Sequence, residues 1–304
     1  MPESKGHLNP GSSGVVLDRF ELGPGLSDLV RHVWVPRWAV PDGEVRPQRV
    51  LTYPAFNAVI EPEAAALYGP DSRLQVQELR GTSWAVGILF RPAAGPLLST
   101  SDPAKLAGSS EPLPAAAPIG QVRRILRSAA YDRDELAAVL RAWLLPVAAD
   151  VGDRGRLVNE ACRLAEEDTS LTRAADLAGR LGVSPRSLER LVRSHVGVTP
   201  KWLIECRRLQ HAATTLFASP GTDLSALAAE LDYSDYPHFF RQYQRVLGES
   251  PKATRDRGRQ AAAPHSQAGS GMGPEDRSAA GKPVRGRNAA APSGAPGGDP
   301  EGAG

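Results

Sequence analysis

The chain contains few of the residues that build metal sites or disulfide frameworks. Only Cys162 and Cys206 are cysteines among 304 residues, and neither a CxxC motif nor a cluster of histidines occurs. Disulfide scaffolds and zinc domains need such clusters, so neither class is indicated. No apolar run reaches eighteen residues, and the start MPESKGHLNPGSSG is not a signal peptide. These absences predict a cytoplasmic protein with no membrane segment, no metal and no cofactor.

The length and the composition of the two ends predict two domains with disordered tails. Domains commonly have about 100 to 200 residues, so 304 residues allow two. Residues 1–15 and 258–304 are rich in small residues and Pro, a composition that does not form a packed core. The basic residues of the second tail are expected to be solvated, with weak attraction to DNA as the alternative: Arg277, Lys282, Arg285 and Arg287. The formal net charge of +2 neither favours nor excludes a nucleic-acid partner.

Residues 16–118 predict a mostly β domain, followed by a helical connector over residues 119–155. Short runs rich in Val, Ile, Trp and Phe, such as SWAVGILFRP, alternate with Pro and Gly. In the connector, Asp132 and Glu135 have the spacing of a capping box, and apolar residues from Leu136 onward repeat on one helical face. We expect Pro146 to kink or stop this helix. The segment DVGDRGR, residues 150–156, marks the boundary before the next domain.

The most informative feature is a repeat. LAGRLGVSPRSLERLVRSHVGVTP begins at Leu177, and LAAELDYSDYPHFFRQYQRVLGESP begins at Leu227. Each copy has the pattern of a helix, a tight turn and a second helix. Leu177, Ala178, Leu181 and Ser184 recur as Leu227, Ala228, Leu231 and Ser234; after one inserted residue, Leu188, Arg190, Val192, Gly197 and Pro200 recur as Phe239, Arg241, Tyr243, Gly248 and Pro251.

The second helix of each copy has an apolar face and a polar outer face, because successive residues are about 100° apart. The apolar faces hold Leu188, Leu191, Val192, His195 and Val196 in the first copy, and Phe239, Tyr243, Val246 and Leu247 in the second. The outer faces hold Arg186, Arg190 and Arg193, and Pro237, Arg241 and Gln244. Such a helix can enter the major groove, where Arg reads guanine and Gln reads adenine. A single outer arginine is usually a solvated charge, but the duplication favours contact with DNA.

Two residues beside these faces allow more than one interpretation. Glu189 can accept a hydrogen bond from cytosine or orient Arg186 or Arg193, and His238 can touch DNA or cap its helix. Between the copies, Thr199 and Pro200 predict the start of a connecting helix that ends near Phe217. Its length of roughly 27 Å could hold two reading helices about one DNA turn, near 34 Å, apart. We expect Cys162, Cys206 and Trp202 to be packing residues.

At these residues the chain resembles the AraC/XylS family of bacterial transcriptional regulators, over residues 156–257. The segments LGVSPRSLERL and YSDYPHFFRQYQRVLGESP carry the resemblance. It implies a seven-helix domain that binds double-stranded DNA, with activation as the commoner outcome and RNA polymerase as a further candidate partner. Base-facing positions are implied for Arg186, Glu189 and Arg190, and for Tyr236, Pro237 and Arg241. The full predicted DNA-binding set is Arg186, Ser187, Glu189, Arg190, Arg193, Tyr236, Pro237, His238, Arg241, Gln244 and Arg245.

The chain departs from the family pattern in its second copy. Asp232 stands where the family commonly has Gly, and Asp adopts the left-handed conformation at modest cost, so the turn should survive. Tyr236 and Pro237 replace commoner small or amide residues. We therefore expect the second copy to make phosphate or shape contacts, and the first copy to read bases.

The N-terminal region, with the motif FRP at Phe90–Pro92, resembles the N-terminal domains of some family members. This implies a barrel-like domain that binds a small-molecule effector or forms a homodimer. A protein-interaction module is the open alternative. A cupin-type metal enzyme needs clustered ligands, whereas only His7 and His32 are histidines there, and a methyl-accepting repair enzyme needs a cysteine before Cys162. The region's aromatic residues either line a pocket or, more simply, form its core: Trp34, Trp38, Tyr53, Trp84 and Phe90.

The sequence thus predicts an α+β chain: a mostly β N-terminal domain followed by helices, then an all-α C-terminal domain of two helix-turn-helix units joined by a long helix. The predicted function is sequence-specific regulation of transcription, responsive to an effector, without enzymatic activity.

Overall fold

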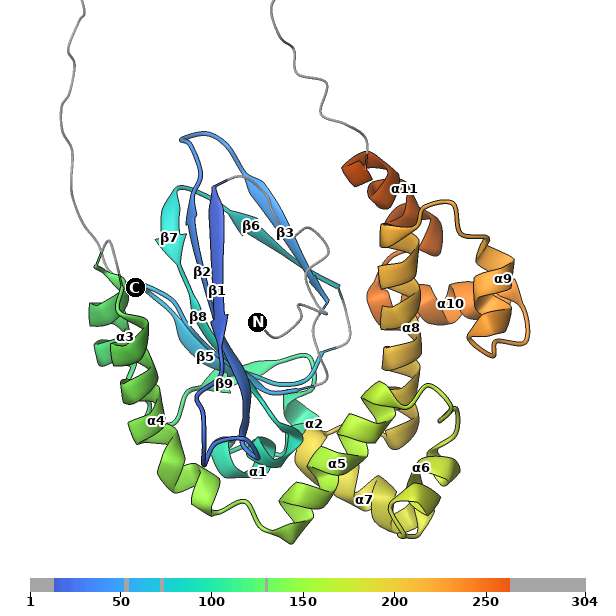
Figure 1. Cartoon of the computed structure of the whole chain (residues 1–304), viewed down its shortest axis with the longest axis horizontal. Coiled ribbons are helices and arrows are strands. Elements are labelled where there is room, and N and C mark those ends of the chain that lie inside the picture. Colours follow the sequence, from blue (N-terminus) through green and yellow to red (C-terminus); the bar gives the residue numbers. More distant parts are fainter. Residues whose placement is uncertain (1–13, 52–54, 72–73, 129–130, 263–304) are drawn as a thin grey trace, which may run out of the picture. The chain divides into compact units, whose positions relative to one another are not determined.

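The computed structural model describes residues 14–51, 55–71, 74–128 and 131–262. The expected tails therefore lie outside the described residues almost entirely, as does Tyr53. The described part begins with strands and ends with helices, which confirms the predicted fold class (Figure 1). Within this part, no helix is both long and apolar enough to cross a membrane.

The N-terminal region is built from antiparallel strands. In chain order these are β1 (Val15–Phe20), β2 (Val30–Ala39), β3 (Arg46–Leu51), β4 (Asn57–Ile60), β5 (Ala65–Tyr68), β6 (Leu74–Leu79), β7 (Thr82–Trp84), β8 (Val86–Phe90) and β9 (Ser110–Pro112). The main sheet has the order β1-β2-β8-β4-β5-β9, with β7 also paired to β2, and β3 pairs with β6 in a separate ribbon. Strand β2 is therefore an interior strand, between the edge strand β1 and β8.

Helices α3 (Ile119–Leu126) and α4 (Arg133–Ala149) pack against one face of this sheet. Their buried residues, including Val122 and Leu140, share one core with Val33 and Ile88 of the strands. The Asp132 side chain caps α4 by accepting hydrogen bonds from the backbone N–H groups of residues 134 and 135. This confirms the predicted start of the helix. The main source of stability for α4 is the burial of its apolar face.

Of the two outcomes expected at Pro146, a kink or a stop, the stop does not occur, because α4 continues to Ala149. A proline interrupts one backbone hydrogen bond and crowds the preceding turn, yet tertiary packing can hold the helix together across it. Here Trp143 and Leu144 are buried in the sheet–helix core immediately before the proline. That burial lies on the same turn as the lost hydrogen bond and offsets it.

Between the sheet and α3, the chain forms the 3₁₀ turn η1 (Pro92–Ala94) and two short helices, α1 (Gly95–Leu98) and α2 (Pro103–Leu106). The small residues Ala93 and Ala94 are buried in this segment. Small side chains let another helix approach the backbone closely. The helices that approach here are α5 and α7 of the C-terminal region.

The C-terminal region contains seven helices among the described residues, as the family resemblance implied. They are α5 (Asp153–Glu167), α6 (Ala174–Arg180), α7 (Pro185–Val196), α8 (Pro200–Ala218), α9 (Leu224–Glu230), α10 (Tyr236–Leu247) and α11 (Pro251–Ala262). Helix α5 begins before Arg156, and α11 continues past Arg257, the residues between which we placed the domain. Near its end, α11 lies so close to α8 that a Cβ atom on Gly258 would overlap the backbone of Phe217.

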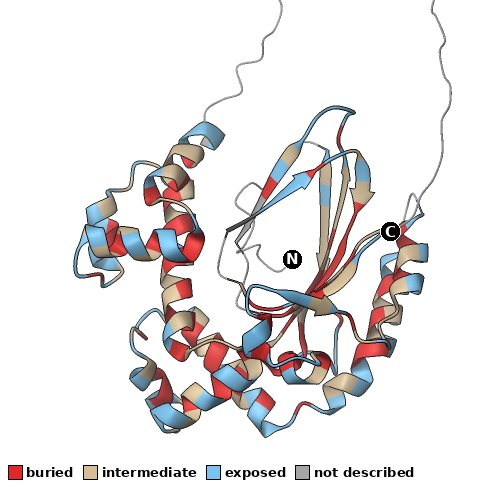
Figure 2. Ribbon diagram, turned by 180° about the vertical axis from the view of Figure 1, so that it is seen from behind, coloured by how far each residue is buried: buried red, intermediate tan, exposed pale blue. Residues whose placement is uncertain are grey.

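Two separate cores lie along α8, one for each repeat unit. The first joins α5, α6 and α7 to the start of α8, and the second joins α9 and α10 to the rest of α8. Trp202 packs against both cores, and Cys162 and Cys206 are buried in the first and the second, as predicted. In Figure 2 the helices carry buried residues toward these cores and exposed residues on their outer sides.

The two units repeat in conformation as well as in sequence. Helix α8 starts at the N-cap Thr199, whose hydroxyl accepts a hydrogen bond from the N–H of Trp202 at 3.1 Å. Helices α7 and α10 both end at a glycine in the left-handed region, Gly197 with φ 78° and Gly248 with φ 75°. The turns before them also need a left-handed residue, which is Gly182 (φ 65°) in the first unit and Asp232 (φ 59°) in the second. Asp232 therefore adopts the conformation that the sequence predicted for it.

Candidate DNA interface

Helix α7 presents arginines on its outer face. Its N-cap is Ser184, whose hydroxyl oxygen accepts a hydrogen bond from the N–H of Ser187 at 3.1 Å. One turn further, Leu188 is fully buried, which fixes the rotation of the helix about its axis. Arg186 and Arg190 are exposed on the opposite side, and neither side chain has a hydrogen-bond or ion-pair partner among the described residues. Both guanidinium groups are therefore available to an external acceptor.

Arg193, on the same outer face, is held by its own helix. Glu189 accepts a hydrogen bond from the Nε of Arg193 at 2.7 Å, four residues along. Of the two roles that the sequence left open for Glu189, orienting Arg193 is the one that the structure contains. The pair is exposed, so water competes with it and the arginine can leave when a stronger acceptor arrives.

Helix α10 has the same type of N-cap and a different outer face. Asp235 accepts a hydrogen bond from the N–H of His238 at 2.6 Å, and this bond lowers the pKa of the Asp235 carboxyl group. The predicted outer residues Pro237, Arg241 and Gln244 are exposed. Tyr236 is half-buried, and its ring contacts those of the neighbouring phenylalanines. The outer face of α10 thus carries one arginine where that of α7 carries three.

Two members of the predicted set lie on a flank of α10 that is directed toward α8. The ring of His238 meets the ring of Tyr233 edge to face, with centroids 5.3 Å apart. The guanidinium of Arg245 forms an ion pair with Glu205 of α8, at 3.1 Å. Sequence periodicity could not separate this flank from the outer face, because the partner Glu205 lies forty residues away on another helix.

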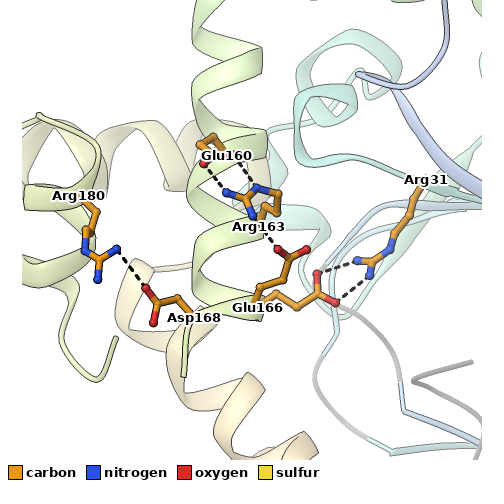
Figure 3. A network of polar contacts seen from close by, with 7 residues as sticks. Arg31, Glu160, Arg163, Glu166, Asp168 and Arg180 are labelled. Atoms are coloured by element: carbon orange, nitrogen blue, oxygen red, sulfur yellow. Dashed lines mark hydrogen bonds and ion pairs between the residues drawn. The ribbon is translucent and has the colours of Figure 1, made fainter. Parts of the chain in front are cut away.

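The first unit is attached to the N-terminal region through a network around α5 (Figure 3). Both terminal nitrogens of Arg31, on β2, donate to the carboxylate of Glu166, at 2.7 and 3.0 Å. Figure 3 also shows Arg163, which pairs with carboxylates of its own helix, and the Arg180–Asp168 pair at 3.4 Å. A two-pronged arginine–carboxylate contact has a defined geometry. It therefore fixes α5 on the end of the sheet.

Asn159 adds a second attachment on the same helix. Its amide nitrogen donates to the backbone carbonyl of Asp28 at 2.7 Å, and its amide oxygen accepts from the backbone N–H of Ala93 at 2.9 Å. One side chain thus satisfies two backbone groups of the N-terminal region. The sequence gave no local signal for Asn159 or Glu166, since their partners lie 66 to 135 residues away.

The C-terminal end of α7 reaches the N-terminal region directly. A Cβ atom on Gly95 of α1 would overlap the backbone carbonyl of His195, and one on Gly197 would overlap the backbone of Pro103 in α2. These contacts hold the end of the first reading helix against α1 and α2. The helix that carries Arg186 and Arg190 is therefore packed directly against this segment.

The aromatic residues that we considered for a ligand pocket have different environments. Trp84 and Phe90 are core residues, as the simpler interpretation held. Trp34 is half-buried and lies across Gly87, where a Cβ atom would overlap its ring, and its indole nitrogen donates to Asn57 at 3.3 Å. Trp38 donates to the backbone of Arg80 at 3.2 Å.

A group of cationic side chains surrounds the buried His32 on β2. Burial is the first cause that lowers the pKa of His32 to about 4, followed by the charges of Arg19, Arg31 and Arg91. His32 is therefore neutral at physiological pH. Because Arg31 also binds Glu166, this group adjoins the attachment of the first unit.

Two family models match parts of this chain. Residues 177–257 match a family model described as a helix-turn-helix domain, and residues 19–112 match a domain of unknown function (DUF6597). A comparison with curated proteins gave no match.

Several solved structures are similar. An AraC-type regulator from Chromobacterium violaceum is 29% identical, over 36% of this chain and 95% of that one, with a TM-score of 0.32. A probable AraC family regulator from Rhodopseudomonas palustris is 26% identical, over 34% and 97%, with a TM-score of 0.32. ToxT from Vibrio cholerae O395 is 12% identical, over 80% and 96%, with a TM-score of 0.38.

The duplicated helix-turn-helix units, their matching caps and the family-model match define a DNA-binding transcriptional regulator. Over residues 177–257, the family-model match supports the resemblance to AraC/XylS regulators.

Proposed function

We propose that the chain reads two adjacent major grooves of one DNA duplex, with α7 as the base-reading helix and α10 as the helix that fixes position. The observation that carries this proposal is the pair of exposed outer faces at the two ends of α8. Helix α8 has 19 residues, so it is about 28 Å long at 1.5 Å per residue. That length, with the packing of each unit, suits two grooves that are about 34 Å apart.

The unequal faces support the division of roles. In α7 the free side chains of Arg186 and Arg190 can each make two hydrogen bonds to guanine. In α10 the exposed Pro237 offers no side-chain donor, and Arg241 is the one arginine of that helix with no hydrogen-bond or ion-pair partner among the described residues. A face of this kind is suited to phosphate and shape contacts.

We also propose that residues 16–118 sense a signal, and that α5 and α7 carry it to the first unit. The support is the direct attachment of α5 through Arg31 and Asn159, and the contact of α7 with α1 and α2. A small-molecule effector, a dimer partner or another protein would act through the same attachment. For this, it must bind two conformations of the N-terminal region with different affinity.

Footprinting of genomic DNA fragments at several salt concentrations tests the DNA-binding part. Arg190→Ala should cost about 1 to 3 kcal/mol at one base pair, whereas Arg241→Ala should weaken binding to all sequences and reduce the salt dependence by about one charge. Arg163→Ala is the matched control, because Arg163 is bound to carboxylates of α5. If neither reading-helix variant differs from the control, the proposed groove geometry is wrong.

A thermal-shift screen of the full chain against metabolites tests the sensing part. A ligand that binds only the folded state must raise the melting temperature. A metabolite that shifts the wild type and changes its DNA affinity would support an effector. Co-purification of a protein partner, with no shift by any metabolite class, would favour the interaction module instead.

A further inference from the structure

Two consecutive arginines near the middle of α8, Arg207 and Arg208, lie outside the proposed DNA interface. Both are half-buried. Consecutive residues of a helix are about 100° apart, so the two side chains leave α8 in different directions. Partial burial of a cation costs solvation free energy unless polar partners replace the water. We therefore looked for the partners of each guanidinium.

Arg207 contacts the first helix-turn-helix unit. Its two terminal nitrogens donate to the backbone carbonyls of Asp168 and Leu171, the second at 3.1 Å. Asp168 is the C-cap residue of α5, and Leu171 is buried in the core of the first unit. The last carbonyls of a helix have no partner within the helix and carry partial negative charge, which favours a cation there. Arg207 thus joins α8 to the end of α5.

Arg208 makes a comparable contact with the second unit. It donates to the backbone carbonyl of Leu231, the C-cap residue of α9, and its guanidinium lies over the ring of Tyr233, 4.4 Å from the centroid. That ring is buried and contacts Phe239 of α10. Between the two contacts lies Asp232, whose φ of 59° is unfavourable for a residue with a side chain. Arg208 therefore holds both sides of the turn that directs α10.

These contacts add direction to the packing of the units on α8. Each unit also packs on α8 through its apolar core, but the hydrophobic effect that drives such packing is non-directional. A hydrogen bond to one backbone carbonyl needs a defined distance and angle. A guanidinium over an aromatic face is likewise a located contact. The arginines therefore restrict rotations of the two units that the cores alone would tolerate.

The electrostatics of the pair show that this arrangement has a cost. Burial lowers the pKa of Arg207, and the charge of Arg208 lowers it further, whereas Asp168 raises it. Two adjacent cations on one helix thus repel each other while both lose water. Their contacts with the ends of α5 and α9 offset this cost, one on each unit.

We propose that Arg207 and Arg208 are positioning residues that fix the two helix-turn-helix units at one angle and one separation on α8. This inference rests on the proposed reading of two adjacent major grooves. Each base pair added between two half-sites moves the second by about 3.4 Å and rotates it by about 35°. A rigid pair of units therefore fits one spacing only. The two arginines determine which spacing the chain accepts, without contacting DNA themselves.

Fluorescence anisotropy of the full chain with labelled duplexes tests the proposal. The probes are the operator protected in footprinting and the same operator with one or two base pairs inserted between its half-sites. For the wild type, one inserted base pair should weaken binding by about tenfold or more, because the DNA must be deformed to fit. This ratio of affinities is the spacing penalty.

Arg207→Ala and Arg208→Ala should each weaken binding to the original operator by about two- to tenfold, as expected for the loss of hydrogen bonds that hold the units in place. Each should also reduce the spacing penalty to about threefold or less, because units that are less preorganised adapt to other spacings. Circular dichroism at the assay temperature shows whether each variant is folded. If Arg208→Ala is unfolded, Arg208→Lys replaces it, since lysine keeps the charge and lacks the planar group.

Two variants serve as controls. His211→Ala removes an exposed side chain of the same helix. Tyr233→Phe removes a hydroxyl that has no hydrogen-bond partner among the described residues, but keeps the ring under Arg208. Both should retain the spacing penalty of the wild type.

Weakening by the same factor at every spacing would show that Arg207 and Arg208 only stabilise the fold, and would overturn this proposal alone. A reduced penalty in His211→Ala would overturn it too, because any change in α8 would then have that effect. If the wild type bound all three duplexes equally, the reading of two grooves by one chain would be wrong, and this proposal with it.

Discussion

Glu166 of α5 accepts hydrogen bonds from both terminal nitrogens of Arg31, a residue of strand β2 that is 135 positions away in the chain. The side chains are 27% and 13% exposed for Arg31 and Glu166. This contact joins the sheet to the first DNA-binding unit. The residue next to Arg31 on β2 is His32, which is buried close to the cationic side chains of Arg19, Arg31 and Arg91. One strand therefore connects the interior of the N-terminal region with the helix that supports α7.

The first prediction concerns the strength of this attachment. In a double-mutant cycle with Arg31→Ala and Glu166→Ala, we expect a coupling free energy of about 1 kcal/mol. This value is at the upper end of the range measured for exposed ion pairs. The two-pronged geometry and the partial burial of Glu166 both favour the upper end. Each residue also takes part in other interactions. A single variant alone would therefore overestimate the free energy of the interaction between Arg31 and Glu166. Urea unfolding of the four proteins gives the required free energies.

Arg163 and Glu167 provide the matched pair, because they have the same chemistry within one helix and are more exposed. Their cycle should give a smaller coupling energy than the Arg31 and Glu166 cycle. Equal values for both cycles would show that the contact between β2 and α5 adds no more than an ordinary surface pair.

The second prediction uses two glycines with the same backbone conformation. Gly197 and Gly248 end the two reading helices with φ angles of 78° and 75°. At Gly248, an added Cβ meets open space, so Gly248→Ala should cost about 1 kcal/mol for the left-handed conformation alone. At Gly197, the same Cβ would overlap Pro103 of α2. Gly197→Ala should therefore destabilise the chain clearly more.

The difference between the two variants measures the contact of α7 with the N-terminal region, since the backbone cost is common to both. Thermal unfolding gives the two values, and hydrogen exchange of α2 shows whether the contact opens. Equal destabilisation, with unchanged exchange in α2, would contradict a tight contact at this point.

The repeat units could be predicted from sequence because their structure depends on local signals. Ser184 and Asp235 precede the reading helices and cap them, and Gly197 and Gly248 follow and end them. Burial of Leu188 and Phe239 followed from helical periodicity. Such signals lie within a few residues of the element that they define, so one sequence is sufficient to find them.

The attachment between the regions could not be predicted, because its residues are far apart in the chain. Nothing near Arg31 distinguishes it from the neighbouring arginines, and Asn159 resembles any polar residue on a helix. The direction of Arg245 was missed for the same reason, since Glu205 determines it across α8 and α10. The helix does not stop at Pro146, because burial of the adjacent Trp143 and Leu144 outweighs the local effect of the proline.

The third prediction concerns pH. Burial and nearby arginines lower the pKa of His32 in the folded chain from 6.5 to about 4. Below pH 6.5 the unfolded chain takes up a proton on this residue, while the folded chain does not until about pH 4. The free energy of unfolding should therefore fall as the pH falls through this window. Between about pH 7.5 and pH 5, His32 should account for a loss of roughly 2 kcal/mol.

Urea unfolding of wild type and His32→Gln at both pH values tests this. Between the two pH values, the free energy of unfolding of the variant should fall by roughly 2 kcal/mol less than that of the wild type. His195 also has a lowered pKa through burial and contributes in the same direction, so it must be kept in both proteins. His211→Gln, at an exposed position, should retain the wild-type dependence. A His32→Gln protein with the wild-type dependence would show that the pKa of His32 does not differ between the folded and the unfolded chain.

The last prediction separates two arginines of α10 that sequence reasoning treated alike. Arg241 is exposed on the outer face and has no hydrogen-bond or ion-pair partner among the described residues, whereas Arg245 is bound to Glu205 of α8. If the outer face meets DNA, Arg241→Ala should weaken binding by about 1 kcal/mol or more and reduce the dependence on salt by about one charge. Arg245→Ala should have a smaller effect on both the affinity and its salt dependence. To contact a phosphate, Arg245 must first break its ion pair with Glu205, and this costs part of the free energy that the phosphate contact supplies. Fluorescence anisotropy with one labelled duplex at several salt concentrations measures both variants under identical conditions. An Arg245→Ala effect equal to that of Arg241→Ala would mean that Arg245 leaves Glu205 on binding and that the flank of α10 is part of the DNA interface.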